Sequence, residues 1–162
     1  MSVPENFQAL QASAIAEHFA AERVNYLFIG RSGAILLGFP GITQDVDLFP
    51  EKSEENGRRI IAALEKLEFE LDGVRRADIV RGKDFVQIKT GSFPLDLVFA
   101  PDGIDSFAAA HARSIENFPV ASLDDIIASK RVSGREKHVD LPLLEDFRAE
   151  YESLHPKPLK SA

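Results

Sequence analysis

The sequence predicts an α/β (α+β) domain in which a mixed, mostly antiparallel sheet of about 4–5 strands has helices packed on it. Segments with helical spacing alternate with short apolar runs typical of buried strands, and three extended runs follow one another between residues 77 and 100. The chain has 162 residues, about the length of one domain. We therefore expect one domain over residues 1–152 and a flexible tail over residues 153–162, which holds two prolines and two lysines.

The first half of the chain alternates helix and strand. An apolar run, YLFI, leads directly into the glycine-rich segment GRSG, which predicts a strand, a tight turn and a helix. A serine before a helical pattern is a favoured N-cap. The elements expected here are a helix over residues 5–21, a strand over 26–29, a turn over 30–33, a helix over 34–37, a strand over 46–49 and a helix after Ser53.

The second half begins with extended runs. The runs ADIV, DFVQIK and PLDLVFA are separated by glycine-containing segments, so they predict an antiparallel meander. Ser122 opens a capping pattern before another helical segment. The elements expected here are strands within residues 77–80, 84–89 and 94–100, then helices that begin near Ile104 and after Ser122 and one that spans residues 137–151.

Composition excludes several function classes. The chain is 44% hydrophobic with 12 Phe, which excludes disordered, collagen-like and coiled-coil proteins. With 19 basic and 26 acidic residues the net charge is −7, so sequence-independent nucleic-acid binding is disfavoured. The absence of cysteine excludes disulfides, thiolate metal sites and a cysteine nucleophile. No apolar run approaches about 18 residues, so we expect a cytoplasmic protein with no membrane partner.

Three aspartates are the candidate chemical groups. Asp45 and Asp47 lie two residues apart at the start of a predicted strand, so their side chains should share one face. Two such charges are tolerated in water, when one is protonated, or when a divalent cation neutralises both. Asp96 lies inside the apolar run FPLDLVF, where an ionised carboxylate needs a partner. The alternatives are a solvated strand end for the pair, an ion pair or sheet-edge position for Asp96, and a purely structural Ca²⁺ or Mg²⁺ site.

The glycine-rich segment over residues 30–33 is a candidate phosphate-binding site. Gly30 and Gly33 let the backbone approach a ligand, the amides of a helix start bind phosphate oxygens, and Ser32 adds a hydroxyl. The segment matches neither the P-loop nor the dinucleotide-binding glycine pattern. Many short glycine turns have no ligand, so the alternative is a simple turn.

Taken together, these features resemble the nucleotidyltransferase superfamily of the polymerase beta fold, in particular its small stand-alone bacterial members. The family pattern is an apolar strand, a glycine at a helix start, a glycine that closes that helix, Thr-x-Asp-hydrophobic-Asp and a later third acid. Residues 120–141, which contain Lys130 and the Arg-x-Lys stretch ending at Lys137, are similar to the C-terminal helices of members linked to toxin–antitoxin and phage-defence systems. The pattern is matched by Gly30, Gly38, Thr43, Asp45, Asp47 and Asp96.

The resemblance implies transfer of a nucleoside monophosphate from an NTP to an acceptor hydroxyl or phosphate, with release of pyrophosphate. It implies two Mg²⁺ or Mn²⁺ ions held by Asp45, Asp47 and Asp96, with Asp96 accepting the acceptor's proton. The resemblance leaves the acceptor open among a tRNA end, a protein side chain and a small molecule, and it implies a cognate toxin or antitoxin as a partner. The residues expected to bind the nucleotide are Gly30, Arg31, Ser32, Gly33, Thr43, Lys130 and Lys137. For the two lysines the alternative is a solvated helix face.

Arg31 departs from the family pattern, which has a second small residue at that position. Its guanidinium could reach the triphosphate, or it could occupy the pocket and prevent binding. The second functional hypothesis is therefore a degenerate nucleotidyltransferase that binds a nucleotide or a partner without turnover.

Overall fold

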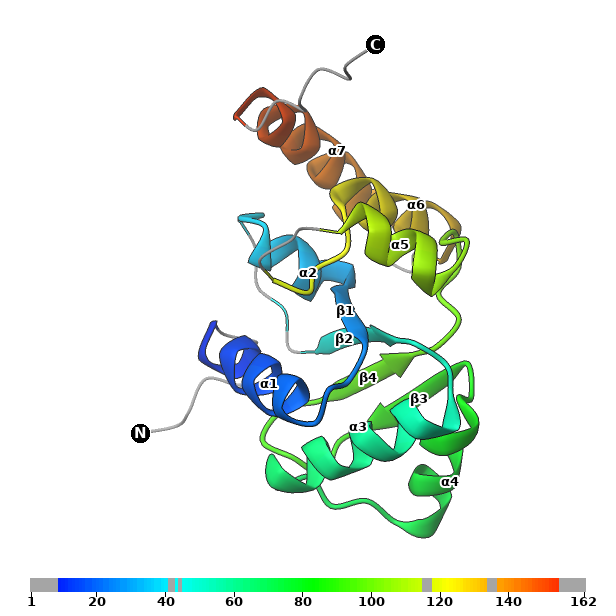
Figure 1. Ribbon diagram of the computed structural model, residues 1–162. Helices are drawn as coiled ribbons and strands as arrows, with labels where there is room; N and C mark the ends of the chain where they lie inside the picture. Colours follow the sequence, from blue (N-terminus) through cyan, green and yellow to red (C-terminus); the bar gives the residue numbers. More distant parts are fainter. Residues whose placement is uncertain (1–8, 41–42, 44, 115–117, 134–136, 155–162) are drawn as a thin grey trace.

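The computed structural model describes residues 9–40, 43, 45–114, 118–133 and 137–154. Within them, four strands form one mixed sheet, and helices pack on both of its faces (Figure 1). The strand order is β1-β2-β4-β3. β2 is antiparallel to β1 and parallel to β4, and β4 is antiparallel to β3, which confirms the mixed, mostly antiparallel sheet. The strands are β1 (Tyr26–Ile29), β2 (Val46–Pro50), β3 (Phe85–Ile88) and β4 (Leu95–Val98).

The helices begin largely where the sequence predicts them. The hydroxyl of Ser53 accepts the Asn56 amide, and the hydroxyl of Ser122 accepts the Asp125 amide, so both predicted caps are confirmed. Among the described residues, no helix is long and apolar enough to cross a membrane. The helices are α1 (Ala9–Ala21), α2 (Gly30–Leu36), α3 (Glu54–Lys66), α4 (Gly73–Arg81), α5 (Phe107–Arg113), α6 (Leu123–Ser133) and α7 (Lys137–Leu154).

The strand predicted over residues 77–80 is wrong, because that segment belongs to α4. Asp72 caps the start of the helix by accepting the Arg75 amide, and Gly82 ends it in the left-handed conformation (φ +68°). Ile79 is fully buried, and a Cβ at Gly57 of α3 would lie 2.7 Å from its carbonyl oxygen, so α3 and α4 pack closely. Capping and this contact outweigh the β-branched residues of the run, and the predicted meander is reduced to the β3–β4 hairpin.

Two helix starts also differ from the prediction. The segment over residues 30–33 is the first turn of α2, not a separate turn before it. The helix expected near Ile104 begins at Phe107, because the Ser106 hydroxyl accepts the Ala109 amide and sets the N-terminus there.

The sheet separates two apolar cores. Phe28, Leu48 and Leu97 point toward α1 and α3. Neighbouring positions point to the other face, where Leu27 and Phe49 pack with residues of α2, α5 and α6. On this second face, three neighbouring positions are polar instead of apolar: Asp47 on β2, Asp96 on β4 and Gln87 on β3. Polar groups therefore extend across three strands, at the edge of the second core.

Candidate active site

Asp47 and Asp96 lie opposite each other on adjacent strands. They are paired in register between the parallel strands β2 and β4, so their side chains share one face of the sheet. Asp96 is 7% exposed, and Asp47 is partly buried. The register therefore brings together two of the three predicted acids, which are 49 residues apart in sequence (96 − 47).

The pair retains a proton near neutral pH. The pKa of Asp47 is raised from 3.8 to about 8, mainly by burial and then by the charge of Asp96 and a hydrogen bond to it. Burial also raises the pKa of Asp96, while hydrogen bonds from Asp47 and Gln87 oppose that rise. Asp47 thus donates its proton to the Asp96 carboxylate.

Asp45 lies just before β2 and is exposed. Its negative charge raises the pKa of both Asp47 and Asp96, so the three acids share one electrostatic environment. The hydroxyl of Thr43 donates to the backbone carbonyl of Asp45 (3.2 Å), and this hydrogen bond holds the backbone just before β2. In the described part of the chain, however, no three acidic or histidine side chains are close enough to hold one ion as they stand.

The first turn of α2 places Asp47. Gly30 has φ +64°, and a Cβ there would lie 2.4 Å from Oδ2 of Asp47. The buried hydroxyl of Ser32 donates to the Ile29 carbonyl (2.9 Å) and accepts the Asp47 amide (3.1 Å). A Cβ at Gly33 would lie 2.9 Å from the Phe28 carbonyl oxygen. The expected donor hydroxyl of Ser32 is thus already engaged, and a direct contact of this turn with phosphate stays a prediction for its backbone amides.

Two of the cationic side chains act on the acids, Lys130 on α6 and Lys89 just after β3. Lys130, on α6, lowers the pKa of Asp47, so this predicted nucleotide-binding residue lies near the acids. Arg31, the second residue of α2, is partly exposed. Lys137 is the first residue of α7, and its side chain lies outside the described part of the structure. Lys89 follows β3, and its charge lowers the pKa of Asp96.

Sequence reasoning missed Gln87 and Lys89. The signal that could have found them is their alternation in the run DFVQIK, which places both on one face of the hairpin strand. Gln87 is paired in register with Asp96, and no such partner could be assigned before the hairpin register was known.

The donors present suit a hard divalent cation. Carboxylate oxygens are the ligands that Mg²⁺ and Mn²⁺ prefer. Oδ1 of Asp96 is buried and has no hydrogen-bond partner among the described residues. An unpartnered carboxylate oxygen in such a place is stabilised by a cation. The paired acids therefore fit the predicted metal.

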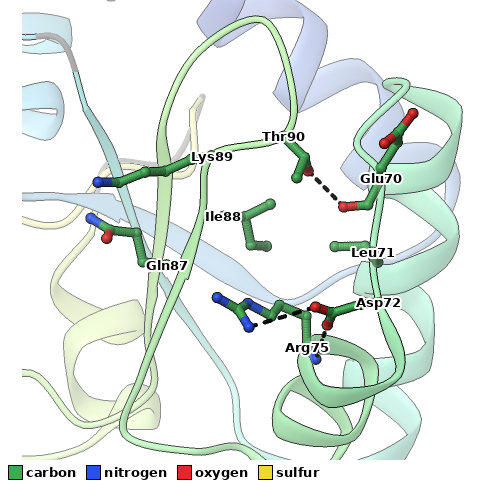
Figure 2. Close-up of a pocket in the computed structure, with 8 residues that line it drawn as sticks. All are labelled: Glu70, Leu71, Asp72, Arg75, Gln87, Ile88, Lys89 and Thr90. Atoms are coloured by element: carbon green, nitrogen blue, oxygen red, sulfur yellow. Dashed lines mark hydrogen bonds and ion pairs between the residues drawn. The ribbon is translucent and has the colours of Figure 1, made fainter.

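A pocket of about 490 Å³ lies between β3 and the segment that leads into α4 (Figure 2). Ile88 and Leu71 point toward each other across it, whereas Gln87 and Lys89 point to the opposite side of the strand. Arg75 at its border is paired with Asp72 (3.6 Å). The pocket is lined by Glu70, Leu71, Asp72, Arg75, Gln87, Ile88, Lys89 and Thr90.

No protein-family model matches this chain, and none of the curated proteins matches its sequence significantly. The resemblance to nucleotidyltransferases thus depends on the residues and their arrangement alone.

Proposed function

We propose that the protein is a metal-dependent nucleotidyltransferase of the polymerase beta fold. The observation that carries the proposal is the in-register pair Asp47–Asp96 on adjacent parallel strands, next to a helix that starts at a glycine with positive φ. The connection of the antiparallel strands β1 and β2 through α2 supports it, because it places the helix start beside the first acids, as the resemblance requires.

In the proposed reaction, the oxygen of an acceptor hydroxyl attacks the α-phosphorus of an NTP. A new O–P bond forms, and the bond between the α-phosphorus and the oxygen leading to the β-phosphorus breaks. That oxygen keeps the electron pair and leaves as part of pyrophosphate. The proton of the hydroxyl passes to Asp96, whose Oδ1 has no hydrogen-bond partner in the described structure.

Each residue of the site has a separate role in the proposed reaction. Asp47 and Asp96, with Asp45, would hold Mg²⁺ or Mn²⁺, which supplies charge neutralisation for the triphosphate when it is bound. Lys130 places a further positive charge on the α6 side of the pair. Gly30 keeps the space beside Asp47 free of a side chain. Arg31 is proposed to contact the triphosphate from the helix start.

A label-transfer experiment tests this proposal. Purified protein is incubated with Mg²⁺, a cell extract and NTPs labelled at either the α- or the γ-phosphate. We expect an acceptor to be labelled from the α-position only, and Asp96→Asn to abolish labelling. Glu150→Gln, which removes an exposed carboxylate on α7, is the matched control and should keep it.

Binding without turnover is the second candidate. It is favoured by the hydroxyls of Ser32 and Thr43, which are both engaged within the protein. In that case the protein would bind an NTP with Mg²⁺, yet no acceptor would be labelled from either position.

A further inference from the structure

The face of the sheet that carries Asp96 is open along β3. Phe85, Gln87 and Lys89 alternate on that face, with Gln87 paired in register with Asp96. Phe85 is 49% exposed, and Lys89 is exposed as well. The same face of β1 and β2 is covered by residues of α2, α5 and α6. The uncovered part of this face therefore lies along β3, next to the buried Asp96.

Lys89 is the cationic side chain in the row formed by Phe85, Gln87 and Lys89. Among the described residues it forms no hydrogen bond or ion pair, whereas Arg75 is paired with Asp72 and Lys83 with Asp78. Figure 2 shows the Lys89 side chain on the same side of the strand as Gln87. Gln87, two residues before Lys89, is paired in register with Asp96, and the charge of Lys89 lowers the pKa of Asp96. A lysine with no hydrogen bond or ion pair among the described residues is available to a ligand.

We propose that the open face of β3 beside Asp96 binds the acceptor, and that Lys89 selects an acceptor with a phosphate group close to its reacting hydroxyl. The inference rests on the proposed function, in which Asp96 takes the proton as the hydroxyl oxygen bonds to the α-phosphorus and pyrophosphate leaves. Gln87 lies opposite Asp96, so Lys89, two residues further along, is a diagonal neighbour of Asp96 at roughly 7–8 Å. That spacing fits a small phosphorylated polyol or sugar, with the phosphate at Lys89 and the hydroxyl at Asp96.

Charge supports a phosphate at this position. The neighbourhood of Asp96 is acidic, since Asp45 and Asp47 act on it, so an anionic acceptor needs a nearby cation to approach. A lysine binds phosphate as a point charge and does not require the two-pronged geometry of arginine. Phe85, at the other end of the row, offers apolar surface to the carbon skeleton of the acceptor.

A binding experiment without metal or NTP tests the site by itself. Glycerol 3-phosphate and glycerol are titrated separately into the ¹⁵N-labelled protein, and the amide shifts of residues 87–90 are followed. We expect shifts with glycerol 3-phosphate only, and about ten-fold weaker binding in Lys89→Gln. Lys83→Gln, at the other end of β3, is the matched control and should bind as the wild type does. Equal responses to the two compounds, or equal losses in both variants, would overturn the proposal.

A transfer assay separates this inference from the function on which it rests. With Mg²⁺ and α-labelled NTP, the wild type should label glycerol 3-phosphate about ten-fold faster than glycerol, and Lys89→Gln should lose that preference. Transfer without a phosphate preference would refute the role of Lys89 and leave the proposed function intact. Phosphate-dependent shifts without transfer to glycerol 3-phosphate or to any acceptor in the cell extract would refute the proposed function and leave the anion site intact.

Discussion

Asp47 on β2 and Asp96 on β4 face each other across a parallel strand pairing and share a proton that Asp47 retains near neutral pH. This arrangement costs stability when the proton is lost, because two negative charges then lie together in a partly buried place. A binding site commonly contains such a cost, which a ligand relieves.

Stability should fall as the pH rises from about 5 to 8. The folded state keeps a proton on Asp47 up to about pH 8, whereas the unfolded chain loses it near 3.8, so the stabilisation is complete below about pH 4 and is lost through pH 8. We expect the free energy of unfolding to decrease by on the order of 1–3 kcal/mol over this range. Asp47→Asn should flatten the dependence in urea unfolding measured at both pH values.

Two comparisons make the pH experiment specific. Glu150→Gln removes an exposed carboxylate and should keep the wild-type slope. Hydrogen bonds from Arg113 lower the pKa of Asp105 to about 2, so Asp105 affects stability only below about pH 4, outside the measured range. If Asp47→Asn kept the wild-type slope, the shared proton would not reside on this pair.

Gly30→Ala should destabilise the protein and displace Asp47. The new Cβ would lie 2.4 Å from Oδ2 of Asp47, at a residue with φ +64°. We expect a loss of about 1–3 kcal/mol in the free energy of unfolding. The matched control is Gly73→Ala, where a Cβ meets nothing within 4 Å, and it should cost far less.

A double variant separates the two causes of this loss. Combining Gly30→Ala with Asp47→Ala removes the collision but keeps the backbone strain, so the two effects should not be additive. Strict additivity would show that Gly30 serves the backbone alone and does not make room for Asp47.

Ser32→Ala should weaken both the fold and the site. Its hydroxyl bonds to the Ile29 carbonyl and the Asp47 amide in a buried place, so its loss should cost about 1–3 kcal/mol. Ser53→Ala removes a helix cap far from the acids and should cost about 1 kcal/mol. Calorimetry with Mn²⁺ and an NTP analogue should show weaker binding in Ser32→Ala only, and equal affinity in the two variants would argue against its positioning role.

Tyr26→Phe should leave stability unchanged or raise it by about 1 kcal/mol. The Tyr26 hydroxyl is buried with no hydrogen-bond partner among the described residues, and burial raises the pKa of the phenol. The ring itself packs edge-on against Phe19 and Phe28, and phenylalanine keeps those contacts. A clear loss of stability in thermal unfolding would reveal an ordered water bound to the hydroxyl.

The sequence correctly predicted those helices and strands whose determining residues are only a few positions apart. The run YLFI and the capping serines Ser53 and Ser122 are such signals, and the structure has a strand and two helices there. The run ADIV was wrongly predicted to be a strand, because residues outside the run determine its conformation. Asp72 caps the start of α4 and Gly82 ends it. The β propensity of the four residues of the run carries no information about these caps.

Only part of the candidate site was predictable, because the rest depends on contacts between residues that are far apart in the sequence. The same-face argument predicted that Asp45 and Asp47 share one face, and the resemblance implied that both act with Asp96. The strand register selects Asp47 as the partner of Asp96 and leaves Asp45 just outside the strand. Gln87 and Lys89 join the site only through the β3–β4 register, which depends on contacts across the hairpin. The engagement of Ser32 with Asp47 depends likewise on residues 15 positions apart.

The most direct test of the central claim, that Asp47 and Asp96 form a metal-dependent nucleotide site, is the melting temperature with and without Mg²⁺ plus a non-hydrolysable NTP analogue. At about one hundred times the dissociation constant, we expect the wild type to gain about 5–10 °C. Asp96→Asn should melt at or above the wild-type temperature without ligand, because it removes a carboxylate charge that burial and the charge of Asp45 disfavour, and should gain nothing from Mg²⁺ and analogue. An equal gain in wild type and Asp96→Asn, or none in the wild type, would contradict the account.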